Sequence, residues 1–161
     1  TFLKRISSHY KTGKPIPMKI MNKIKKNKTL FNGLHYIRQL IMALYDMKIH
    51  SNEKGLDIEK VYNEYRELLS PLIYNTNDCI AANFAHLMSG YESGYYGYLW
   101  SEVYAAEVFQ LFKKSGDIFN SKIGLKYRQC ILEKGGTETG FKMMEDLLGR
   151  KPNSDAFMKS I

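Results

Sequence analysis

Apolar residues at helical spacing are the feature that most limits what this chain can fold into. From Leu30 onward they recur three or four positions apart, at Leu30, Leu34, Ile37, Ile41 and Leu44. This spacing places the side chains on one face of a helix. Other apolar residues widen that face, namely Phe31, Leu40, Tyr45 and Met47. We therefore predict a long helix that is buried on more than one side.

Further segments show the same periodicity together with helix-ending residues. Asp57 is a predicted N-cap, and Pro71 stops the helix that follows it. The inner stripe of that helix is predicted to be Ile58, Val61, Tyr65, Leu68 and Leu69. A third long helix is predicted from the stripe Trp100, Val103, Tyr104, Val108, Leu111 and Phe112, and Gly116 ends it.

The remainder of the chain also lacks a strand pattern. The segment "CIAANFAHLM" is read as a short helix, "SKIGLKYRQCILEKGG" as a helix closed by Gly135 and Gly136, and "TETGFKMMEDLLGRKP" as a helix stopped by Gly149 and Pro152. Alternation of apolar and polar residues does not extend beyond four positions. The sequence therefore predicts an all-α fold of six to eight helices, with residues 1–161 as a single helical unit.

The net charge permits acidic partners without requiring them. The chain has 24 Lys and Arg against 16 Asp and Glu, a formal net charge of +8. Basic residues gather in "KIMNKIKKNK", from Lys19 to Lys28, where Ile20, Met21 and Ile24 are apolar. We interpret this segment as the solvated face of a helix, and a phosphate-binding patch is the alternative.

Targeting and redox signals are weak. No apolar run approaches the about 18 residues of a membrane span, and the start "TFLKRISSHYKTGK" has no signal-peptide core. We expect no membrane-spanning helix and no signal peptide. The absence of Met before Thr1 hints at a piece of a longer protein.

Cys79 and Cys130 show no paired spacing. We expect two reduced, partly buried thiols in an intracellular protein.

The motifs of self-sufficient catalytic sites are missing. The four histidines, His9, His35, His50 and His86, include no pair at the spacing of HExxH, and no CxxC occurs. "GGTETG" lacks the lysine and the preceding strand of a phosphate-binding loop, and no GxSxG is present. We therefore expect no metal site built from this chain alone.

The segment "HLMSGYESGYYGYLW", from His86 to Trp100, nevertheless suggests chemistry. Gly90, Gly94 and Gly97 predict a flexible loop. Tyr91, Tyr95 and Tyr98 follow at spacings of four and three, and with His86 they offer neutral hydrogen-bond donors of the kind that stabilise an oxyanion. The alternatives are tyrosines that pack against neighbouring helices, or that stack on single-stranded nucleic acid.

At this loop the chain resembles the thimet oligopeptidase and neurolysin family of zinc peptidases. "FAHLMSGYESGYYGYLWSEV" is similar to the family pattern F-G-H-L-x-G-G-Y-D-x-x-Y-Y-G-Y-L-W-S-x-V. The resemblance extends in order to "SSHYKTGKPIP", "GLHYIRQL", "KYRQCIL" and "LLGRKPNSDAFM", and so spans nearly the whole chain.

The resemblance implies a helical endopeptidase that cuts short peptides in a narrow channel. It implies a zinc cofactor whose ligands, two histidines of HExxH and a glutamate, lie upstream of this chain. His86 and Tyr98 match residues that stabilise the oxyanion, and Tyr91 and Tyr95 match residues that contact the peptide. For Tyr96, which also matches a family tyrosine, we predict a packing role.

These expectations define three hypotheses. The first is the C-terminal part of a zinc oligopeptidase, inactive as an isolated chain, with short peptides and the upstream zinc-binding half of the same polypeptide as partners. The second is a standalone peptide-binding module without turnover. The third, ranked last, is a basic nucleic-acid-binding helical domain. The resemblance implies a cytoplasmic protein, with mitochondria as the alternative, and no membrane partner.

Overall fold

The computed structural model describes residues 2–51, 54–75 and 79–161, and within these ranges it contains α-helices, 3-10 turns and one π-helical turn but no strand. The α-helices are α1 (Phe2–Ile6), α2 (Met18–Leu30), α3 (Asn32–His50), α4 (Ile58–Leu69), α5 (Gly97–Lys114), α6 (Ser121–Tyr127), α7 (Gly140–Leu148) and α8 (Asp155–Met158). The 3-10 turns are η1 (Ala81–Asn83) and η2 (Ala85–Leu87), and the π-helical turn is η3 (Arg128–Leu132). The all-α prediction is confirmed. In the described ranges no helix has the length and apolar character to cross a membrane.

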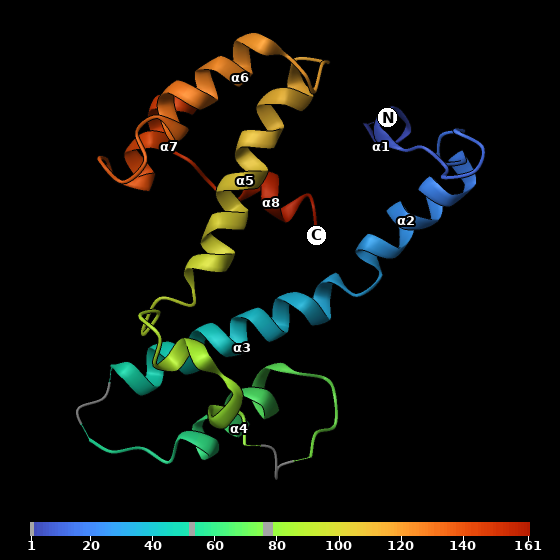
Figure 1. Ribbon diagram of the computed structural model, residues 1–161. Helices are drawn as coiled ribbons and strands as arrows, with labels where there is room; N and C mark the ends of the chain where they lie inside the picture. The colour runs from blue at the N-terminus through green and yellow to red at the C-terminus, as the bar shows by residue number, and fades with distance from the viewer. Residues whose placement is uncertain (1, 52–53, 76–78) are drawn as a thin grey trace.

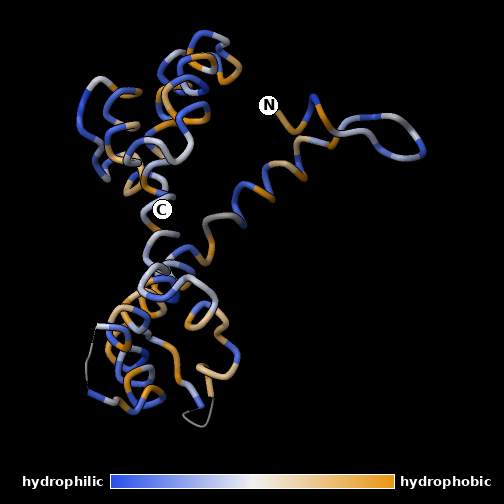
Figure 2. Tube along the Cα trace, turned by 60° about the vertical axis from the view of Figure 1, so that its left-hand side comes forward, coloured by the Kyte–Doolittle hydropathy of each residue, from blue (hydrophilic) through white to orange (hydrophobic). Residues whose placement is uncertain are grey.

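The helices form two groups joined by the segment between η2 and α5. The first group consists of α3, α4, η1 and η2, and the second consists of α5 to α8, with α8 lying against α5 (Figure 1). Helices α1 and α2 extend away from the first group as an arm (Figures 1 and 2). The arm returns to the second group at its tip, where the ring centroids of Phe2 and Phe119 lie 5.9 Å apart. The molecule is therefore open rather than spherical.

The core of the first group is small and aromatic. Met42 and Tyr45 of α3 pack with Val61 of α4, with Leu87 of η2, and with Phe84 between the two 3-10 turns. Tyr45 is fully buried, and among the described residues its hydroxyl has no hydrogen-bond partner. Burial, followed by the nearby Glu59 and Tyr62, raises the pKa of Tyr45 to about 12.

The second group is held together by a buried charge as well as by apolar packing. Met144 and Leu147 of α7 are buried. Glu107 of α5 is only 2% exposed, and its Oε2 accepts a hydrogen bond from Arg150 Nη2 at 2.5 Å. This ion pair ties the segment that leads from α7 to α8 onto α5.

Local end signals are confirmed at several helices. The side chain of Asp57 accepts a hydrogen bond from Lys60 N at 3.0 Å, and α4 ends at Leu69, just before Pro71. Gly149 follows α7 in the left-handed conformation, which glycine adopts without a steric penalty. Two predicted helices differ: "CIAANFAHLM" forms the two 3-10 turns, and the helix that begins at Ser121 changes to π-helical hydrogen bonding at Arg128.

The predicted buried faces of α3 and α4 are partly wrong. In α3 the buried residues are Ile41, Met42, Ala43, Tyr45 and Asp46, whereas Leu44 is exposed, as is Leu30 at the end of α2. In α4 Val61 is buried but Leu68 is 75% exposed. The cause is that α4 and the 3-10 turns cover only one side of α3 within the described ranges, so apolar residues on its other side remain at the surface.

Two smaller predictions concern lysines and cysteines. The lysine side chains at positions 19, 23, 25 and 26 on α2 are exposed, which confirms the solvated face, and that of Lys28 lies outside the described residues. Cys79 and Cys130 form no disulfide. Cys130 is half-buried as expected, but Cys79 is exposed because it lies in the connection before η1 rather than in a core.

Candidate functional site

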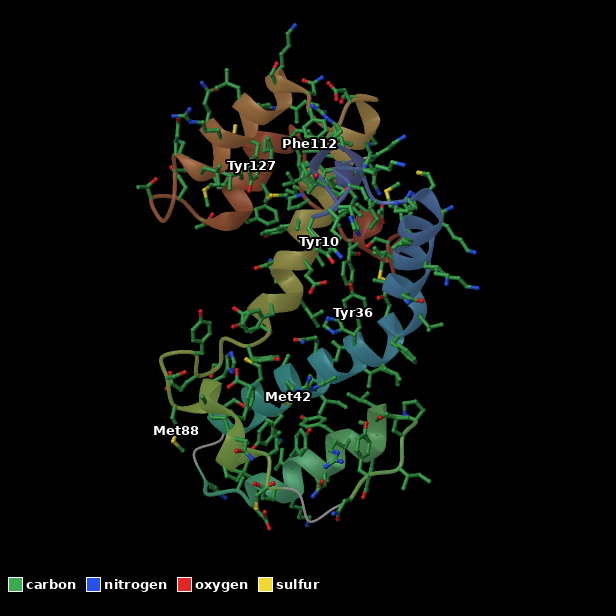
Figure 3. All side chains as sticks on the ribbon, turned by 45° about the vertical axis from the view of Figure 1, so that its right-hand side comes forward. Tyr10, Tyr36, Met42, Met88, Phe112 and Tyr127 are labelled. Carbon is green, nitrogen blue, oxygen red and sulfur yellow. The ribbon has the colours of Figure 1, made fainter. Side chains whose placement is uncertain are left out.

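The four predicted site residues come together where the two helix groups meet. His86 lies on η2, Tyr91 and Tyr95 on the segment that follows, and Tyr98 in the first turn of α5. The His86 ring centroid lies 5.5 Å from that of Tyr91, 5.1 Å from that of Tyr95 and 5.7 Å from that of Tyr98. In Figure 3 the segment that carries Met88 runs beside the end of α3 that is remote from α2. We call these four residues the histidine–tyrosine cluster.

A direct hydrogen bond joins the two residues with predicted catalytic roles. His86 Nε2 and Tyr98 Oη are 3.1 Å apart, and either atom can donate, depending on the imidazole tautomer. The Tyr91 and Tyr98 rings stack with an interplanar angle of 6°. Tyr98 is 44% exposed and Tyr91 is 51% exposed, so both residues lie at the surface.

Glycines shape the segment between His86 and α5. Gly90 has φ +84°, a conformation that other residues adopt at a cost. A Cβ atom at Gly94 would lie 3.0 Å from the Tyr91 carbonyl oxygen, which is a tight contact. Gly97 is the first residue of α5 and has open space around it. Glycine is therefore favoured at the first two positions by backbone geometry, and the flexibility of the loop stays a prediction.

Burial and nearby polar groups act in opposite directions on the pKa of Tyr95. Burial raises the pKa of Tyr95, and the nearby Arg38 and a hydrogen bond with Gln39 oppose this only in part. Both Arg38 and Gln39 lie on α3. Tyr95 also packs edge-on against the buried Phe84, with ring centroids 5.1 Å apart. It therefore anchors the cluster to the core of the first group.

Asp46 of α3 is a site residue that sequence reasoning missed. It is 0% exposed, and its two carboxylate oxygens accept hydrogen bonds from Ser93 N at 3.1 Å and Tyr95 N at 3.0 Å. His50 Nδ1 lies 2.9 Å from both the Asp46 carbonyl oxygen and Oδ1, and since both are acceptors the imidazole donates. The available signal was an acidic residue four positions after Met42 on an apolar helix face.

Tyr96 lies just before α5 and is 51% exposed. Its ring is thus outside the core, and its predicted packing role stays a prediction.

The cluster suits hydrogen-bond donation rather than metal binding or covalent chemistry. Within residues 2–51, 54–75 and 79–161 no three His, Cys, Asp or Glu side chains are arranged to hold a metal ion. An imidazole and several phenols are neutral donors that can face a polarised carbonyl without adding a fixed charge. Such a group can stabilise negative charge that develops on a bound ligand.

Comparison with known proteins places this chain among peptidases. The family model described as "Peptidase family M3" matches residues 1–161. Saccharolysin of Saccharomyces cerevisiae is 38% identical over 161 residues, which cover 97% of this chain and 22% of saccharolysin. Thimet-like oligopeptidase of Dictyostelium discoideum is 32% identical over 161 residues, covering 98% of this chain and 24% of that protein.

A bacterial relative gives the same result. Oligopeptidase A of Escherichia coli is 32% identical over 158 residues, covering 96% of this chain and 23% of its own length. The chain thus spans less than a quarter of the length of these curated relatives. The resemblance to the thimet oligopeptidase and neurolysin peptidases is confirmed at the level of the family, and this chain belongs to peptidase family M3.

Proposed function

We propose that this chain is the C-terminal part of a zinc-dependent oligopeptidase and supplies its hydrogen-bond donors. The observation that carries the proposal is the convergence of His86 and Tyr98, joined at 3.1 Å, with Tyr91 and Tyr95 in one partly exposed cluster on a family M3 chain. Residues 1–161 would form one helical unit of a larger catalytic domain.

The chemistry assigned to this chain follows from neutral donors. Attack on a peptide carbonyl places negative charge on its oxygen, and donors held about 3 Å from that oxygen lower the barrier. We assign this role to the hydroxyl of Tyr98 and the imidazole of His86. Tyr91 and Tyr95 would contact the peptide near the scissile bond, and the family resemblance gives short peptides as the substrate class.

Zinc would supply an activated water in the assembled enzyme. The described residues of this chain do not fit that ion, because they contain no cluster of three ligating side chains. The proposal therefore places all zinc ligands in an upstream half of the same polypeptide and assigns no step at the metal to this chain.

The surface of this chain supports such an upstream partner. Large apolar side chains are exposed on α5 and around it, including Trp100, Phe109, Leu132 and Phe31. Exposed large apolar side chains in such number favour a contact with another protein segment. Leu44 of α3 is exposed as well. An upstream half of the polypeptide would bury both regions.

For the location of the protein we propose the cytoplasm, with mitochondria as the alternative. Two relatives from Arabidopsis thaliana are named "Probable cytosolic oligopeptidase A" and "Organellar oligopeptidase A, chloroplastic/mitochondrial", so the names of similar proteins include both locations. Fractionation of source cells, with detection of this chain in each fraction, decides between them.

The test of the proposed chemistry is Tyr98→Phe in the complete zinc-loaded polypeptide, with Tyr96→Phe as the matched control. Both variants remove one hydroxyl from a half-exposed ring. We expect Tyr98→Phe to lower kcat by about 100- to 1000-fold, the cost of one lost oxyanion donor. Tyr96→Phe is expected to leave kcat unchanged. Equal kcat values for the two variants would contradict the proposal.

A second test concerns the size of the natural protein. An antibody raised to this chain is used to detect the protein in a lysate of source cells. We expect a band several times heavier than 18.7 kDa, since the chain covers under a quarter of its relatives. A single band at 18.7 kDa would favour the standalone peptide-binding module. The purified chain alone is expected to show no peptide hydrolysis.

A further inference from the structure

We propose that Asp46 is a positioning residue that fixes the histidine–tyrosine cluster by holding the backbone of the loop that carries it. The inference rests on the proposed function for its kinetic consequence, but its structural content does not. Asp46 contacts none of the cluster hydroxyls. It acts on the polypeptide between His86 and α5, through the N–H groups of Ser93 and Tyr95.

The Asp46 carboxylate is hydrogen-bonded mainly to the loop. Asp46 is fully buried on α3, and a buried charge is retained only where hydrogen bonds compensate for the loss of water. Its two oxygens take two backbone N–H groups that are 47 and 49 residues away in the sequence. His50, one helical turn later, donates to Oδ1 and to the Asp46 carbonyl. All the named partners of this carboxylate are therefore loop backbone or the imidazole that supports it.

The backbone conformation at Ser93 also indicates a restraint. Ser93 has φ +58°, and within the described residues no other residue except glycine has a positive φ. A side chain makes this left-handed conformation unfavourable, so it persists where surrounding contacts impose it. The hydrogen bond from Ser93 N to Asp46 is such a contact. Asp46 therefore holds the loop in a shape that the loop would not adopt freely.

The backbone that Asp46 binds continues directly into the histidine–tyrosine cluster. Tyr95, whose N–H binds Asp46, has its ring 5.1 Å from both the His86 and the Tyr98 rings. Tyr98 follows within one helical turn of Tyr95, and Tyr98 N donates to the Tyr95 carbonyl. A displacement at Tyr95 is thus passed on directly to the Tyr98 hydroxyl.

The experiment compares Asp46→Asn with Glu107→Gln in the complete zinc-loaded polypeptide. Each variant converts one buried carboxylate to its amide, but Glu107 binds Arg150 and not the loop. The amide introduced by Asp46→Asn has a single acceptor oxygen and cannot serve both N–H groups as the carboxylate does. We therefore expect residues 88–98 to exchange amide hydrogens faster in Asp46→Asn only. We expect kcat to fall by about 100-fold with KM nearly unchanged, because misplaced donors act on the transition state.

Two further measurements extend the test, and the first of them needs no variant, so it stays informative if Asp46→Asn does not fold. In the unmodified protein the amide hydrogens of Ser93 and Tyr95 should exchange more slowly than that of the exposed Glu92, by about tenfold or more. In the Asp46→Asn background, Ser93→Gly should recover part of the lost kcat, since glycine adopts positive φ without help. A merely structural role for Asp46 would give no such recovery.

The outcomes separate this inference from the proposed function. Unchanged loop exchange in Asp46→Asn, or equal exchange of Ser93, Tyr95 and Glu92 in the unmodified protein, overturns the role of Asp46. Faster loop exchange with unchanged kcat also overturns it as a positioning role in the reaction. If Tyr98→Phe leaves kcat unchanged, the proposed function fails, while the exchange data still decide whether Asp46 holds the loop.

Discussion

Asp46 and Glu107 are both buried carboxylates on long helices, yet they are compensated in different ways. Glu107 on α5 accepts from the guanidinium of Arg150, which is itself half-exposed. Asp46 on α3 accepts from two backbone N–H groups of a loop and from His50. One carboxylate fastens a terminal segment to a helix, and the other fixes the shape of a loop.

The difference indicates what each part of the molecule is built to do. A side-chain ion pair tolerates movement, because the long arginine side chain can follow its partner. Two hydrogen bonds to backbone atoms two residues apart restrain the loop at Ser93 and Tyr95. The first arrangement holds the helices of the second group together, and the second sets the positions of Tyr95 and Tyr98.

Among substitutions that test this difference, Arg150→Met is expected to cause the largest loss of local stability. The substitution leaves the buried Glu107 without its guanidinium, and we expect the segment around α8 to lose about 2 kcal/mol of local stability. Hydrogen exchange of residues 149–158 measures this loss. The double variant Glu107→Gln with Arg150→Met should lose less. Exchange of residues 88–98 should not change in either variant, and a change there would show that the two regions are coupled.

A smaller effect is expected from His50→Ala. The two backbone hydrogen bonds to Asp46 remain, and only one donor of three is lost, so the loop should lose about 1 kcal/mol of local stability. Lys48→Ala, at an exposed position of the same helix turn, is the control. Hydrogen exchange of residues 88–98 in both variants gives the comparison. Equal exchange in the two would mean that His50 does not support the carboxylate.

The smallest change in stability at neutral pH is expected from Tyr45→Phe. Unlike the two carboxylates, the buried Tyr45 hydroxyl has no hydrogen-bond partner among the described residues. Its removal should therefore change the stability of the first group by less than about 1 kcal/mol at pH 7.

At alkaline pH the same variant should differ more clearly. The pKa of Tyr45 is raised to about 12 in the folded chain, so between about pH 10 and 12 the unfolded chain binds fewer protons and stability falls as pH rises. Tyr45→Phe should remove that part of the pH dependence. Urea unfolding at pH 8 and pH 11 measures it, with Tyr10→Phe, an exposed tyrosine, as the control. The same pH dependence in both variants would contradict the assignment to Tyr45.

The existence of the long helices and several of their ends could be predicted because they depend on local sequence. Asp57 caps α4 through a bond to a residue three positions away, and Gly149 ends α7 through its own backbone conformation. The buried faces could not be predicted as well. Leu44 and Leu68 satisfy helical spacing but are exposed, because burial depends on which neighbouring helices cover a face. No local pattern specifies that.

The candidate site, like the fold, could be predicted only where it depends on local sequence. Spacing predicts several neutral donors on a glycine-rich loop, and the geometry of Gly90 and Gly94 agrees with that. The roles of His86 and Tyr98 came only from resemblance to a family, because spacing does not specify that they meet. The contact of Asp46 with Ser93 spans 47 residues, and no periodic pattern contains it.

The most direct test of this account is a double-mutant cycle of Asp46→Asn and Tyr98→Phe, measured as kcat of the complete zinc-loaded polypeptide. If Asp46 acts by placing the Tyr98 hydroxyl, its loss costs much less once that hydroxyl is absent, and the double variant is far more active than the product of the two single effects predicts. Fully multiplicative effects would mean that the two residues act independently, and would contradict the claim that Asp46 works through the loop.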